Sequence, residues 1–298
     1  MNDDPRFEMV GIRSDLAQRP VFQRRRRTLK GKPIASAILL GIILLGCLCC
    51  EVFIPKDPTY MDLLNYSVAP NGEFWFGTDT LGRDIFSMIW YGGRISLFIG
   101  FAATAISTFI AVIVGACSGV APKWLDTLIM RAAEILLSVP TLLIIVFVQA
   151  ILGQANVLSI ALVIGITSWV SIAKVVRTEV RQIRASEYVV ASKCMGGGFF
   201  HVLRRHLAPN FVSAILFMVI MNIRSAIVSE STLSFMGIGL PLEVISWGSM
   251  LSLSEKALLA RSWWIILIPG AFLVVTLLLI TNIGDYLRGR VNRAERNL

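Results

Sequence analysis

Charged residues are scarce in this sequence of 298 residues. Asp, Glu, Lys and Arg together make up 16% of the chain and hydrophobic residues 55%, whereas a soluble domain carries about 25% charged residues. The deficit coincides with uncharged runs such as 135–152 and 263–283, and about 18 apolar residues suffice for a helix to cross the hydrocarbon core. Alternating segments of about ten residues, typical of membrane barrels, are missing. The composition therefore excludes a soluble fold and predicts an all-α, polytopic transmembrane helical bundle.

Residues that usually carry catalysis or bind metals are equally few. Both histidines, His201 and His206, fall in one basic segment, and no Ser, His and Asp constellation is visible. The phosphate-binding loop G-x-x-x-x-G-K-[ST] is absent, so the chain is not expected to hold ATP through that motif. Four of the five cysteines lie in apolar runs, where cysteine acts as a small hydrophobe. We therefore expect no catalytic residues, no metal site, no bound cofactor and no enzymatic activity.

Hydropathy predicts six membrane spans, at 34–54, 95–120, 135–152, 157–173, 210–228 and 263–283. The first is longer than the apolar core of a signal peptide, so it is expected to stay as an anchor. The second span carries a stripe of small residues at a spacing of four, which lets another helix approach closely; the stripe is Ser107, Ala111, Gly115 and Gly119. In the third, Pro140 removes one helical hydrogen bond and is expected to kink the helix.

Basic residues are distributed unevenly around these spans. Most of the 28 Lys and Arg residues lie in 1–33, 121–124, 174–209 and 284–298, whereas the intervening loops hold only Lys56, Arg83, Arg94, Lys256 and Arg261. The positive-inside rule therefore predicts that both termini are cytoplasmic. The membrane that holds the chain is expected to be the plasma or inner membrane of the cell. The expected organisation is a basic N-terminal segment 1–33, a transmembrane domain 34–284 with outer loops 55–94 and 229–262, and a C-terminal tail 285–298.

Few charged side chains fall within or near the predicted spans. Arg131 and Glu134 are three residues apart on one helix face and predict an ion pair near the interface. Arg224 is the one candidate for a buried charge, and snorkelling to the interface is the alternative. Ion-coupled secondary transporters usually carry internal repeats and intramembrane acids, and neither is found. That class is disfavoured, and a membrane protein without transport activity is a third alternative.

The loop 174–209 contains a pattern typical of a docking element. Ser186 can cap a short helix, and Glu187 lies in its first turn, where the helix dipole favours an acidic side chain. Ala191 shares a face with Glu187, and the glycines 196–198 are a stop signal. A short helix held between two spans is suited to a cleft in a partner protein. A membrane-surface helix without a partner is the alternative.

This loop resembles the EAA loop of ABC importer permeases. The residues that match are Glu187, Tyr188, Ala191, Ser192, Gly196, Pro209 and Asn210, with Ser192 at a position where the family has alanine. A second block resembles the F-G-T-D-x-L-G-R-D signature of the dipeptide, oligopeptide and nickel branch, through Phe76, Gly77, Thr78, Asp79, Leu81, Gly82, Arg83 and Asp84. A third block, 231–239 followed by 246–248, is similar to that branch's outer loop between the last two spans.

The resemblance implies a type I ABC importer permease fold and a C-type permease subunit that forms half of a translocation path. The short helix would be the coupling helix, in which Glu187 contacts a cytoplasmic ATPase, Ala191 allows close approach and Gly196 lets the chain turn. The implied partners are a second homologous permease, ATPase subunits that use ATP and an extracytoplasmic substrate-binding protein, all at the lipid bilayer and without nucleic acid. Di- or oligopeptides are the expected substrates, with nickel, a metallophore complex or glutathione as alternatives. The signature 76–86 is expected to brace a turn near the binding-protein dock.

Overall fold

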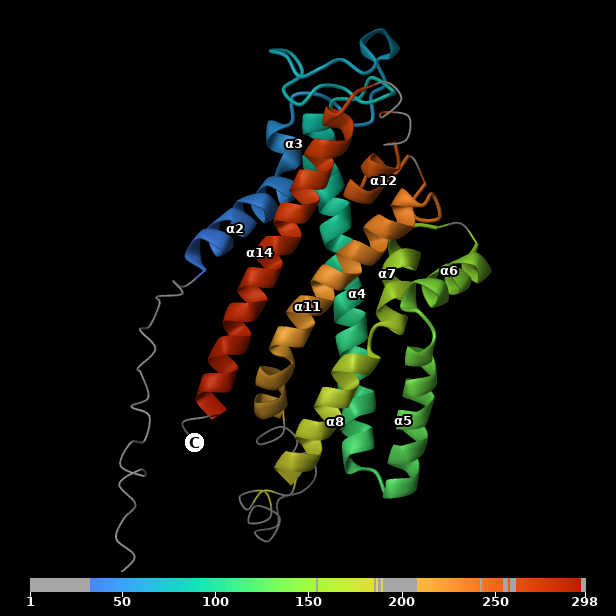
Figure 1. Cartoon of the computed structure of the whole chain (residues 1–298), viewed down its shortest axis with the longest axis vertical. Coiled ribbons are helices and arrows are strands. Elements are labelled where there is room, and N and C mark those ends of the chain that lie inside the picture. The colour runs from blue at the N-terminus through green and yellow to red at the C-terminus, as the bar shows by residue number, and fades with distance from the viewer. Residues whose placement is uncertain are drawn as a thin grey trace, which may run out of the picture.

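The computed structural model describes residues 33–153, 155–184, 186, 189, 208–241, 243–253, 257 and 261–295, without the side chains of 208–213 and 290–295. Its elements are helical, and they follow one another as α2 (Ile34–Leu48), α3 (Cys50–Phe53), η2 (Leu63–Asn65), α4 (Ile85–Val120), α5 (Lys123–Ser138), α6 (Thr141–Leu152), α7 (Val157–Thr167), α8 (Val170–Arg184), α11 (Ala208–Phe235), α12 (Trp247–Ser252) and α14 (Trp264–Glu295). Figure 1 shows these helices as one bundle, with the loops of residues 54–84 gathered over one end. We call this segment the cap.

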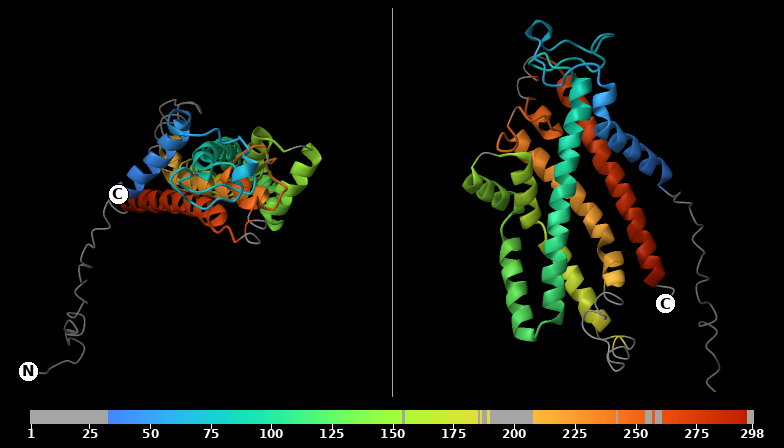
Figure 2. Two further views of the ribbon diagram at one scale, coloured as in Figure 1. Left: turned by 90° about the horizontal axis from the view of Figure 1, so that it is seen from above. Right: turned by 180° about the vertical axis from the view of Figure 1, so that it is seen from behind.

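Helix α4 is the axis of the bundle. It runs the height of the bundle (Figure 2) and packs against α2, α7, α8 and α11. Asp84 begins it as an N-cap, because its carboxylate accepts a hydrogen bond from the Ser87 backbone N–H at 2.9 Å. With 36 residues the helix is about 54 Å long, more than the hydrocarbon core requires. It begins ten residues before the predicted span, so Arg94 belongs to the helix and pairs there with Glu51 at 2.7 Å.

The small-residue stripe of α4 is confirmed as a helix-packing face. All four of its members are buried. A Cβ atom at Gly115 would lie 2.6 Å from the Ala173 carbonyl oxygen, and one at Gly119 would lie 2.7 Å from Val180 Cγ1. Because neither position has room for a side chain, the backbones of α4 and α8 approach closely there. This contact holds α8 against α4.

Two of the predicted spans are broken helices. The kink expected at Pro140 is confirmed. The sequence predicted one kinked helix over 135–152, whereas the structure has two helices, α5 and α6, that meet at 91°. The span predicted over 157–173 is likewise divided into α7 and α8, at 45°. Helix α8 then continues to Arg184, so the first part of the predicted 174–209 loop is helical. Pro140 has no N–H to continue the helical hydrogen bonds between α5 and α6, and α7 ends at its C-cap, Ser168.

The first predicted span, 34–54, is divided into α2 and the short helix α3, with Cys49 between them. Among the described residues, three helices are long and apolar enough to cross a membrane, namely α4, α11 and α14, and counting each bent pair as one span gives five. The apolar helix α2 has 15 residues, short of the roughly 20 that a span requires. It lies beside α14 (Figure 1) and ends at Cys49. Helix α11 extends to Phe235, seven residues beyond its predicted end.

The contact between α4 and α8 can be tested with a matched pair of valine variants. We expect Gly115→Val to lower the free energy of unfolding by about 1–3 kcal/mol, because its side chain overlaps α8. Gly41→Val is the control, since a Cβ atom at Gly41 has no neighbour within 4 Å. Thermal unfolding in detergent measures both. Equal melting temperatures for the two variants would contradict close packing at Gly115.

Candidate functional site

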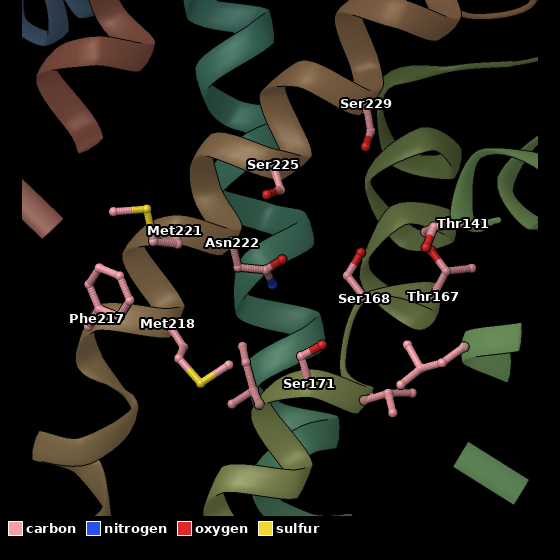
Figure 3. A pocket seen from close by; sticks show the side chains of 13 residues that line it. Thr141, Thr167, Ser168, Ser171, Phe217, Met218, Met221, Asn222, Ser225 and Ser229 are labelled. Carbon is pink, nitrogen blue, oxygen red and sulfur yellow. The ribbon is translucent and has the colours of Figure 1, made fainter. Parts of the chain in front are cut away.

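A cavity of about 380 Å³ lies among the broken helices and α11. Figure 3 shows side chains from α6, α7, α8 and α11 around it. Its polar lining consists of Thr141, Thr167, Ser168, Ser171, Asn222, Ser225 and Ser229, and its largest apolar lining residues are Phe217, Met218 and Met221. The described lining carries hydroxyl, amide and thioether groups, and none of its members is a charged residue.

Both helix breaks border this cavity. Leu137 and Thr141 line it on either side of the α5–α6 break, and Ser168 and Val170 line it at the α7–α8 break. A helix end leaves backbone groups without intrahelical partners. Within a membrane such groups are tolerated only where they are buried in protein or line a water-filled cavity. The breaks therefore indicate a hydrated cavity, and broken helices around a central site are typical of transporters.

Asn222 is held in place at the cavity wall. Its amide Nδ2 donates a hydrogen bond to the Ser107 hydroxyl of α4, and that hydroxyl donates in turn to the Thr104 carbonyl at 3.2 Å. Figure 3 shows the Asn222 side chain extending from α11 toward Ser168 and Ser171. Ser107 was expected from the sequence only as a small packing residue. It also orients a polar side chain of the cavity.

The predicted signature 76–86 lies in the cap, where its charged residues brace a turn. Asp79 accepts hydrogen bonds from the backbone N–H groups of Leu81 and Arg83, both at 2.8 Å, and from Arg83 Nε at 2.7 Å. The side chains of this ion pair are nearly fully buried. Gly82, between them, has a φ of +76°, and a Cβ there would lie 1.8 Å from the Asp62 carbonyl oxygen. Only glycine fits this turn.

The same signature attaches the cap to two helices. Thr78 donates its hydroxyl to the Asn65 carbonyl at 2.5 Å, and its own carbonyl accepts a hydrogen bond from Trp264 Nε1 of α14 at 3.1 Å. Phe76 contacts Phe86 of α4 and Phe272 of α14. The signature therefore lies in the cap, and the cavity is lined by other elements.

Glu230 is a functional candidate that the sequence did not reveal. It was assigned to an outer loop, but it lies in α11 and is fully buried. Four hydroxyl groups donate to its carboxyl group, from Ser96, Ser231, Ser234 and Ser246, at 2.8–3.3 Å. These serines belong to α4, to α11 and to the N-cap of α12. Glu230 therefore joins three elements one residue beyond Ser229, which lines the cavity. The third sequence block, expected as a loop, accordingly begins as the end of α11.

The remaining sequence expectations have mixed outcomes. The ion pair of Arg131 with Glu134 is confirmed, at 3.1 Å. Arg224, for which burial and snorkelling were both open, is exposed on α11 and so is not buried within the described part of the chain. The backbone of Pro209 and Asn210 lies in the first turn of α11. The other predicted coupling residues, Glu187, Tyr188, Ala191, Ser192 and Gly196, lie outside the described residues, so their roles stay predictions.

The hydroxyl cluster predicts a difference between two variants of Glu230. Glu230→Ala removes the acceptor of four buried hydroxyl groups and should lower the free energy of unfolding by about 2–4 kcal/mol. Glu230→Gln keeps the shape and one oxygen acceptor, so we expect a smaller loss. Thermal unfolding in detergent ranks the two variants against wild type. A Glu230→Ala protein as stable as wild type would show that the cluster does not hold these elements together.

Comparison with known proteins agrees with this arrangement. Residues 107–296 match the family described as binding-protein-dependent transport system inner membrane component. A putative peptide permease protein of Brucella suis is 33% identical over 98% of this chain and 97% of its own length. The dipeptide transport system permease protein DppC of Bacillus subtilis is 34% identical over 88% of this chain and 82% of its own length. The oligopeptide transport system permease protein OppC of the same organism is 36% identical over 86% of this chain and 83% of its own length. The chain thus belongs to the family of inner membrane components of binding-protein-dependent transport systems, and it is a multi-pass permease subunit of the ABC importer class.

Proposed function

We propose that this chain forms half of a membrane path for di- or oligopeptides, and that the cavity of Figure 3 is its part of that path. The observation that supports this proposal most directly is that the cavity lies at two helix breaks and has a neutral polar lining. Hydroxyl and amide groups can exchange hydrogen bonds with a peptide backbone, which every peptide offers in the same form. A lining without fixed charge does not select among peptides by the charge of their side chains. The names of the relatives support peptides over nickel.

We propose further that energy reaches the path from separate ATPase subunits. The sequence lacks the phosphate-binding loop, and the predicted coupling helix, with Glu187, Ala191 and Gly196, follows directly after α8. The first residues of α8 line the cavity. A partner that moves the coupling helix would therefore transmit its movement to the path through the single helix α8. A second permease would supply the other half of the path, and a substrate-binding protein would deliver peptide at the cap.

We also propose that both termini are cytoplasmic and that the cap is outside. The uneven distribution of Lys and Arg supports this orientation. In the structure the cap lies at one end of the bundle, and the last residues of α14 lie at the other (Figure 1). If the C-terminal end of α14 is cytoplasmic, the cap therefore lies outside the cell.

Charged variants of Ser225 test the proposed path. In the assembled transporter, Ser225→Asp should favour lysine-containing over glutamate-containing tripeptides by about thirtyfold, because a unit charge at about 4 Å attracts the one and repels the other by about 1 kcal/mol each even in water. Ser225→Lys should reverse the preference. Uptake of the two peptides into proteoliposomes measures the ratio.

The matched control is the pair Gly289→Asp and Gly289→Lys, at an open position of α14. These variants should leave the ratio unchanged. An unchanged ratio in the Ser225 pair, with uptake intact, would place the path elsewhere.

Two single cysteines test the orientation in a background without the native cysteines. Gly72→Cys in the cap and Gly289→Cys in α14 occupy positions where a Cβ atom has no neighbour within 4 Å. In intact cells an impermeant thiol reagent should label Gly72→Cys, and it should label Gly289→Cys only after the membrane is permeabilised. The opposite labelling pattern would reverse the proposed orientation.

A further inference from the structure

A second polar cluster gathers around Asp126, in the first turn of α5, away from the cavity. Its carboxylate is 4% exposed. It accepts hydrogen bonds from Nε and Nη2 of Arg177, from Nη2 of Arg181 at 2.7 Å and from the Ser118 hydroxyl at 2.5 Å. The donors belong to α4 and α8, so one side chain of α5 connects three helices. A bidentate arginine fixes geometry as well as distance, because its planar fork matches a carboxylate.

Side-chain packing alone does not hold α5 against α8 at this level. A hollow of about 410 Å³ opens between the two helices, and Asp126 and Arg177 border it together with residues such as Met130, Glu134 and Lys174. The other ion pair across it, between Lys174 and Glu134, is 3.9 Å long and partly exposed. Among the described residues, the Asp126 cluster is therefore the shorter of the ionic connections between these helices, with a buried carboxylate and two partly exposed arginines.

The cluster lies on the route from the coupling loop to the cavity. Arg177 and Arg181 occupy the last two turns of α8, just before the predicted coupling helix, and the start of α8 lines the cavity. Helix α5 runs from Asp126 to Leu137, another lining residue, and then meets α6 at the 91° break. A rigid α5 that moves with α8 would pivot at Pro140, beside the cavity.

We propose that Asp126 is a positioning residue for transport, because it makes α5 follow α8 when the coupling loop moves. Close packing at Gly115 and Gly119 joins α8 to α4, and the Asp126 carboxylate joins α5 to both. Movement at the coupling loop then reaches the cavity along two walls, α8 directly and α5 through the break at Pro140. This inference rests on the proposed function, since it assumes that ATPase subunits act on this loop.

The first experiment uses the complete transporter in proteoliposomes and measures peptide uptake, ATP hydrolysis and assembly. Asp126→Asn should lower the number of peptides transported per ATP by about tenfold, within the range of 5- to 150-fold typical of coupling between sites. Asp126→Glu should recover part of the ratio, and Arg181→Gln, which removes one donor, should have an intermediate effect. Glu134→Gln is the control, because it removes the partly exposed pair of the same helix and should leave the ratio near wild type.

The second experiment follows the movement itself and does not depend on the substrate. Spin labels at Leu128 of α5 and Ile151 of α6, both exposed, report the distance across the break, in a background without native cysteines. ATP and vanadate should change this distance in wild type and in Glu134→Gln, and the change should be lost in Asp126→Asn and reduced in Arg181→Gln.

The outcomes separate this inference from the proposed function. A wild-type complex that changes the label distance but takes up no peptide would contradict the proposed substrate and leave the role of Asp126 supported. Wild-type distance changes and a wild-type transport ratio in Asp126→Asn would overturn the inference. If Asp126→Asn does not assemble, Arg181→Gln decides. Lower stability with an unchanged ratio and distance change in that variant would show a purely structural role.

Discussion

The need to satisfy every backbone hydrogen bond in an apolar surrounding governs this structure. Long helices such as α4 and α11 meet that need internally, so they can face lipid along their length. The broken pairs α5–α6 and α7–α8 cannot, and both breaks border the same cavity. The cavity thus lies at the positions where the helices are interrupted. The close contact of α4 with α8 then joins one of the broken pairs to an unbroken helix, so this wall of the cavity is packed against α4.

Much of the fold follows from local sequence. Hydropathy predicts α4, α11 and α14, the spacing of four predicts the packing face at Gly115 and Gly119, and Pro140 marks a break. These features depend on residues within a few turns of each other. The break in the first predicted span was not foreseen, because hydropathy continues across Cys49 whereas the helix is divided there into α2 and α3.

The two buried acidic clusters, around Asp126 and Glu230, depend on contacts between distant parts of the chain. Arg177 reaches Asp126 across 51 positions, and Ser96 reaches Glu230 across 134. No periodicity within either helix indicates the partner. Glu230 also ends an apolar run, so a hydropathy scan assigns it to a loop, whereas four hydroxyl donors allow it to be buried in α11. The only sequence sign was the abundance of serine around Glu230, in 225–234.

The contact between the cap and α14 bears on how the chain is made. Trp264 follows its hydrogen-bond partner Thr78 by 186 positions, and a Cβ at Gly77 would lie 2.9 Å from the Trp264 ring. During synthesis the cap emerges early, but its bonding is complete only when the last helix has inserted. A chain interrupted before α14 would expose an unfinished cap to proteases and chaperones. The folding of the cap thus depends on whether synthesis has reached the N-terminal end of α14, so an unfolded cap marks an incomplete chain.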